Sequence, residues 1–301
     1  MASQSNRHGA VGAVTRIVVA IALACGSGRF AAAADSLYRA QAIVTGQGET
    51  NRIIGFASSL EDVLIKVSGA LKLAGDVRLE PYKARAKDFV KAYDYHDQMT
   101  GTPKRDEQGT RDRPYDLIVD FDETKTDGLL ATLGLKPWSA QRPGLGVFVE
   151  MEQGARQFIV TSDGKQSDLQ RESLSAAAAK RGMAVVLPDE AALAKANVSA
   201  AELMVTPSGK LTAITGGSGG EVALVGHLTW SDDDLGWITA WRIEFQGRAH
   251  QWQIRGVTFD EAFRRGLGGA AQILSGNAIR NDRRLRVRDG AGGSERGRAV
   301  V

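Results

Sequence analysis

The stretch that decides the fold covers residues 222–257, which read VALVGHLTWSDDDLGWITAWRIEFQGRAHQWQIRGV. Apolar residues recur at alternate positions in it, which is the pattern of strands that bury one face. The segments Asp232-Asp233-Asp234 and Gly247-Arg248 interrupt the pattern and predict two turns. The stretch therefore predicts a three-stranded antiparallel meander whose tryptophans share one face.

A turn at Gly247-Arg248 also predicts the register of the second hairpin. It sets Ile243 opposite Trp252 and Trp241 opposite Ile254, so that apolar side chains meet across the strands. A helical pattern of apolar residues follows at Phe259, Phe263, Leu267, Ala270, Ala271 and Leu274. We expect this C-terminal helix to cover the tryptophan face, with the tryptophans in the core.

The rest of the chain alternates between short strands and helices. Strands are expected at residues 37–45, 116–121, 144–151, 157–160 and 184–187, and helices at residues 53–67, 81–92, 125–133 and 169–180. Residues 93–113 have no period and predict a surface loop or a two-stranded flap. We expect an α+β or α/β protein with two small lobes of mixed sheet and packed helices.

These patterns divide the chain into four parts. The expected parts are a signal peptide at 1–34, an N-terminal lobe at 35–153, a C-terminal lobe at 154–275 and a tail at 276–301. The tail is rich in Arg and Gly and has hardly any aliphatic residues, so we expect it to be disordered.

The N-terminal segment has the features of a secretory signal. Arg7 and Arg16 precede a short apolar run, and four alanines ending at Ala34 follow it. We expect cleavage near Ala34, a periplasmic product and no transmembrane helix in that product. The alternative is a lipoprotein anchored through Cys25.

Charge is unevenly distributed along the chain, whose net charge is +3. Residues 1–34 contain three arginines and no acid, so the remainder is neutral. The tail from residue 276 contains seven arginines and three acids, which leaves the body of the protein at −4. A nucleic-acid-binding fold concentrates positive charge on its body, so we expect no nucleic-acid partner.

Few residues in the expected product are suited to catalysis. The single cysteine lies in the signal, and only His96, His227 and His250 remain with the body. We therefore expect no disulfide, no metal site and no cofactor. The expected role is non-catalytic binding or scaffolding in the cell envelope, with an envelope protein or a glycan as partner and the oligomeric state left open.

The alternative function is a periplasmic metal-dependent or acid/base hydrolase. It would use Asp120 and Asp122, which end an apolar strand, together with His96. A carboxyl group in an apolar pocket can act as a general acid, and carboxylates with histidine can hold a metal.

Two candidate binding surfaces follow from the strand pattern. The first is the polar face opposite the tryptophans, which is expected to present His227, Thr229, Arg242, Glu244, Gln251, Gln253 and Arg255. The second consists of Trp138 and Arg142, whose alternative role is to fix the crossing between the lobes.

Several motifs in order along the chain resemble an uncharacterised bacterial family, the domain-of-unknown-function family 2066. They are Asp62–Gly69, Pro137-Trp138, Arg142-Pro143, Arg181-Gly182, Leu187-Pro188, Leu224-Val225-Gly226, Trp241 and Trp252. The resemblance covers residues 37–275 and implies an exported proteobacterial protein. The family has no assigned activity, so the resemblance implies no catalytic residue.

Overall fold

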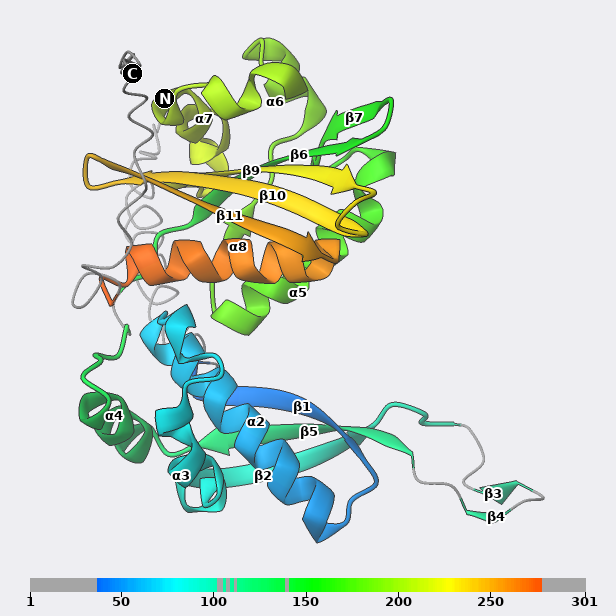
Figure 1. The fold of residues 1–301 in the computed structure, drawn as a ribbon, viewed down its shortest axis with the longest axis vertical. Helices are drawn as coiled ribbons and strands as arrows, with labels where there is room; N and C mark the ends of the chain where they lie inside the picture. The colour runs from blue at the N-terminus through cyan, green and yellow to red at the C-terminus, as the bar shows by residue number, and fades with distance from the viewer. Residues whose placement is uncertain (1–36, 102–104, 107–108, 111–112, 139–140, 278–301) are drawn as a thin grey trace, which may run out of the picture. The chain divides into compact units, whose positions relative to one another are not determined.

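The structure, a computed structural model, describes residues 37–101, 105–106, 109–110, 113–138 and 141–277. It is a mixed α/β protein, as expected, and it divides into two compact units (Figure 1). The first unit takes Met1–Val67 and Lys72–Gln141, and the second takes Ser68–Leu71 and Arg142–Val301. The expected signal at 1–34 and the tail from residue 278 lie outside the described residues.

The first unit contains a three-stranded antiparallel sheet with the order β1-β5-β2. Its elements are β1 (Arg39–Thr45), α2 (Glu49–Ser68), α3 (Glu80–Lys83), β2 (Val90–Asp97), β3 (Arg105–Asp106), β4 (Gly109–Thr110), β5 (Pro114–Phe121) and α4 (Glu123–Thr132). Helix α2 packs tightly against the sheet at Gly55. A Cβ atom at this position would lie 2.5 Å from Leu117 and 2.8 Å from Val44. Leu60 and Leu64 of this helix are fully buried, whereas Ile53 and Ile54 near its start are exposed.

Strand β2 replaces the end of the helix expected at residues 81–92 and the start of the loop expected at 93–113. Tyr93 packs edge-on against Phe56 of α2 at 5.2 Å, and Tyr95 packs against Tyr115 of β5 at 6.0 Å. These contacts between rings distant in the sequence stabilise a strand whose own composition is polar.

The second unit contains a larger mixed sheet with the order β11-β10-β9-β6-β7, and β8 also pairs with β6. Its elements are β6 (Leu145–Gln153), β7 (Arg156–Ile159), α5 (Asp168–Arg181), β8 (Val185–Val186), α6 (Glu190–Lys195), the 3₁₀ helix η5 (Ala200–Val205), α7 (Ser208–Thr215), β9 (Val222–Ser231), β10 (Gly236–Phe245), β11 (Arg248–Val257) and α8 (Phe259–Leu274). Helices α6 and α7 lie on one side of this sheet, and α5 and α8 lie on the other (Figure 1).

The boundary between the units differs from the one expected after residue 153. Strand β6 was assigned to the N-terminal lobe, but it pairs in parallel with β9 and β8 and belongs to the second unit, which begins at Arg142. A strand buried on both faces has no alternation that would link it to one sheet, so its partner cannot be inferred locally.

The expected meander and its helical cover are confirmed. Strands β9, β10 and β11 are antiparallel neighbours, and α8 packs against β10 and β11. Trp241 is only 1% exposed, and its ring stacks on Trp252 with centroids 6.5 Å apart. Cβ atoms at Gly226 and Gly266 would lie 2.6 and 2.5 Å from Trp241, so this indole is held between the two glycines.

The expected register of the second hairpin is wrong by two residues. Trp241 pairs with Trp252, and the turn is Gln246-Gly247 instead of Gly247-Arg248. Both turn residues have positive φ angles, +51° and +70°, as a two-residue turn with glycine in second place requires. Because a shift of two residues keeps every side chain on its face, the division into apolar and polar faces is still correct.

Candidate functional site

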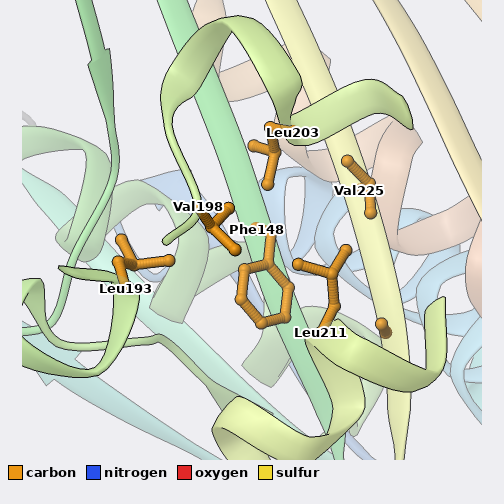
Figure 2. Packing of buried hydrophobic residues seen from close by; sticks show 7 residues of the cluster. Phe148, Leu193, Val198, Leu203, Leu211 and Val225 are labelled. Carbon is orange, nitrogen blue, oxygen red and sulfur yellow. The ribbon is translucent and has the colours of Figure 1, made fainter. Parts of the chain in front are cut away.

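The face of the larger sheet opposite the tryptophans is apolar at one end and polar at the other. At the apolar end, Phe148 of β6 and Val225 of β9 pack against the helices on this side of the sheet (Figure 2). The contacting residues are Leu193 of α6, Leu203 of η5 and Leu211 of α7. Further along β6 and β9, the same face carries Glu150 and Glu152 beside His227 and Thr229. Strand β11 continues it with Gln251, Gln253 and Arg255. We call this polar part the open sheet face.

Most of the residues expected on the polar face do lie there. Gln251, Gln253 and Arg255 are exposed, and the Arg255 guanidinium pairs with the Asp234 carboxylate at 2.9 Å. Glu244 is also exposed, at the end of β10 beside the turn. These side chains are accessible for contact with another molecule.

Arg242 differs from this group because its guanidinium is used inside the unit. It donates hydrogen bonds to the carbonyl oxygens of Leu203 and Thr206, at 3.1 and 2.5 Å, and to Ser208 Oγ at 3.3 Å. Burial lowers the pKa of Arg242, and the negative charge of Glu244 opposes that shift. Arg242 therefore fixes the segment between η5 and α7 to β10.

Two carboxylates converge on one imidazole at the open sheet face. His227 Nε2 lies 3.1 Å from Glu152 Oε2 and 3.9 Å from Glu150 Oε1. One ligand atom from each of the three residues lies within 4.8 Å of the other two. Glu150 is only 3% exposed, whereas Glu152 and His227 are half-buried. The parallel pairing of β6 with β9, which sets Glu150 opposite His227, produces this cluster.

Two further side chains orient the members of the cluster. Gln157 of β7 donates a hydrogen bond from Nε2 to Glu150 Oε1 at 2.5 Å. Thr229 Oγ1 lies 2.9 Å from His227 Nε2 and donates to Glu152 Oε2 at 3.4 Å. In the described part of the chain, neither carboxylate forms an ion pair with lysine or arginine.

The sequence analysis identified His227 and Thr229 but missed Glu150, Glu152 and Gln157. The strand at 144–151 was expected in the other lobe, so its acids were not placed near His227. One local signal was available, because two glutamates at alternate positions end an apolar strand and must share one face of it.

The two residues of the second candidate surface, Trp138 and Arg142, lie in different units. Trp138 is 8% exposed and belongs to the first unit, where its backbone N–H donates to Val67 O at 2.7 Å. Arg142 belongs to the second unit and donates to the carbonyl oxygens of Arg181 and Gly182. Each residue thus forms at least one hydrogen bond within the unit to which it belongs.

The residues of the alternative hydrolase do not come together. Asp120 forms a two-bond ion pair with Arg39, at 2.6 and 3.0 Å. Asp122 caps α4 by accepting from the Lys125 N–H at 2.9 Å. His96 lies opposite Asp116 in the sheet. Asp116 precedes Asp120 by four residues along β5, which separates these two positions by about 13 Å at the rise of a strand.

A cavity of about 370 Å³ is lined by residues of β6, β7 and β10 and by residues at the start of α5. Its lining includes Trp237, Phe158 and Leu169 together with the charged residues Arg156, Lys165 and Asp168. Trp237 is only 8% exposed, so most of its indole ring is buried in the core and little of it faces the cavity.

Comparison with known sequences gives one result. A family described as a domain of unknown function (DUF8605) matches residues 31–139, which belong to the first unit except for Ser68–Leu71. The expected likeness to an uncharacterised family is therefore found, although the matching family carries another number than 2066 and covers a shorter range. No curated protein and no solved structure matches the chain. None of the helices in the described residues has the length and apolar character needed to cross a bilayer.

Proposed function

We propose that this protein is a non-catalytic binding protein of the cell envelope, and that it holds a protein partner along strand β11 and the open sheet face. The observation that carries the proposal is the position of β11, a strand of ten residues that forms one edge of the sheet. Six of its ten residues are exposed, and four of these are polar: Arg248, Gln251, Gln253 and Arg255.

The backbone of β11 supports a protein partner over a glycan. Within the described residues, the main chain of β11 bonds only to β10, so the other edge offers amide and carbonyl groups for a further strand. Extended segments of other proteins bind such edges by continuing the sheet. Arg248 and Arg255, near the two ends of β11, are residues that oppose indiscriminate edge pairing.

The envelope location rests on the sequence of residues 1–34, which has the pattern of a secretory signal. Periplasmic release after cleavage near Ala34 is the version that we favour, and anchoring through Cys25 is the alternative. Mass spectrometry of the mature N-terminus distinguishes the two, because an acylated Cys25 and an unmodified Asp35 differ in mass and position.

The non-catalytic role is favoured because the three residues of the rival hydrolase are separated and occupied. Asp120 and Asp122 are engaged by Arg39 and by the start of α4, and His96 lies at the other end of β5. No arrangement of a general acid and a base is available from these three residues.

The proposal is tested by crosslinking in envelope extract. A photoreactive amino acid at the exposed Gln253 should yield a discrete crosslinked protein. The same group at Val205, which is 80% exposed on η5, is the matched control and should not yield it. With the probe kept at position 253, the double variant Gln251→Glu with Arg255→Glu should abolish capture while leaving the fold intact, because both side chains are exposed. The same captured protein from both positions, or an unchanged yield from the double variant, would contradict the proposal.

A further inference from the structure

We propose that Glu150, Glu152 and His227 form a binding site for a divalent transition-metal ion of the Zn²⁺ type. The site stands on its own observations and does not depend on the partner proposed above. It was not expected from the sequence, which predicted no metal site.

The geometry fits such an ion with small adjustments. Ligands at about 2.1 Å from a tetrahedral zinc lie roughly 3.4 Å from one another. The contacts of His227 Nε2 with the Glu152 and Glu150 oxygens, 3.1 and 3.9 Å, lie on either side of that value. All three atoms lie within 4.8 Å of one another, so rotations of the side chains suffice to bring them around one centre.

The charges of the cluster also favour binding of a cation. Glu150 is almost completely buried, and Glu152 ends near the same nitrogen atom. Burying a carboxylate is costly unless the charge is paired or coordinates a metal. Within the described residues, only His227 can form an ion pair with these carboxylates, and one imidazolium would leave a net negative charge.

The surroundings resemble those of protein metal sites. Gln157 holds the Glu150 carboxylate through a hydrogen bond from β7, and such outer contacts orient ligands and raise affinity. The Thr229 hydroxyl is close enough to Glu152 to donate to it when His227 turns toward the ion. All of these side chains stand on neighbouring strands, which are rigid supports.

The ligand types define the class of ion. One imidazole and two carboxylates suit Zn²⁺, and to a lesser degree Mn²⁺ or Co²⁺, better than Ca²⁺, which takes six to eight oxygen ligands. Three protein ligands leave at least one coordination position for water or for a group from another molecule. Because Glu152 and His227 are half-buried, an ion can reach the site from solvent.

The test is metal binding by the full chain, purified without a histidine tag and treated with a chelator. Isothermal titration with Zn²⁺ should show one saturable site per chain, and Co²⁺ should give the visible absorption of a low-symmetry complex. His227→Gln and Glu152→Gln should remove that site. Gln157→Leu should weaken it by roughly 10- to 100-fold, as expected for an outer contact.

The controls separate this site from incidental binding at surface histidines. His96→Gln, near Asp116, and His250→Gln should leave the stoichiometry and the dissociation constant unchanged. Glu152→Gln is the key variant because the side chain is half-buried and its loss should leave the fold intact, as checked by circular dichroism. Absence of saturable binding, or equal binding by the wild type and Glu152→Gln, would overturn the proposal.

Discussion

Arg242 shows how one residue can satisfy a surface pattern and yet serve the interior. Its position on β10 alternates with the tryptophans, so the sequence correctly assigns it to the polar face. Its guanidinium is nevertheless occupied by three oxygen atoms of residues 203–208. The sequence could not predict this, because the segment that accepts these bonds is more than thirty residues away.

Replacing Arg242 by methionine should destabilise the second unit. The change keeps the aliphatic stem but leaves two carbonyl groups without their charged donor, which costs about 1.5–3 kcal/mol. Urea denaturation followed by tryptophan fluorescence measures the loss. Arg255→Met is the matched control, since its exposed ion pair should contribute at most about 1 kcal/mol. Equal losses in both variants would contradict the role assigned to Arg242.

At the scale of elements, the packing of α8 on the sheet depends on small residues beneath the indoles. A methyl group at Gly266 would lie 2.5 Å from the Trp241 ring. Gly266→Ala should therefore cost about 1–3 kcal/mol through overpacking. This exceeds the gain of up to about 1 kcal/mol that alanine brings to a helix. Thermal unfolding monitored by near-ultraviolet circular dichroism reports the change.

Two variants check that the cost arises from this contact. Gly209 lies in α7 with no atom near its would-be Cβ, so Gly209→Ala should be neutral or stabilising. The double variant Gly266→Ala with Trp241→Phe should lose less stability than the two single variants together, because the smaller ring makes room for the added methyl group. If the double variant were only the sum of its parts, the contact would not be the cause.

The turn between β10 and β11 gives a second prediction at this scale. Gln246 has a φ of +51°, which is unfavourable for most side chains but tolerated by asparagine. Gln246→Asn should raise the free energy of unfolding by a few tenths of a kcal/mol, whereas Gly247→Ala should lower it by roughly 1–2 kcal/mol. Chemical denaturation of both variants checks the turn. If Gln246→Asn lowered the free energy of unfolding and Gly247→Ala raised it, the turn at Gln246-Gly247 would be contradicted.

The sequence predicts elements better than it predicts their partners. The faces of the meander followed from alternation alone, and the helix over it followed from spacing. The register and the place of β6 did not, because each depends on contacts between segments far apart in the chain. For the same reason His227 was a visible candidate, while Glu150 and Glu152 became its neighbours only through the pairing of β6 with β9.

At the scale of the whole molecule, the proposed metal site links stability to the ion. Zn²⁺ at about one hundred times its dissociation constant should stabilise the second unit by roughly 2.7 kcal/mol, because only the folded chain assembles the ligands. Differential scanning calorimetry should show this gain, and excess chelator should reverse it. The His227→Gln variant should have the same melting temperature with and without Zn²⁺. A Zn²⁺-dependent shift in that variant would contradict the assignment.

The most direct test of the binding role is amide hydrogen exchange on the protein alone and on the complex recovered by crosslinking. The account predicts that exchange slows along Arg248–Val257, whose outer main-chain groups would gain partners, while the buried amides of α5 are unchanged. Slowed exchange confined to the β1-β5-β2 sheet, with β11 unaltered, would contradict it.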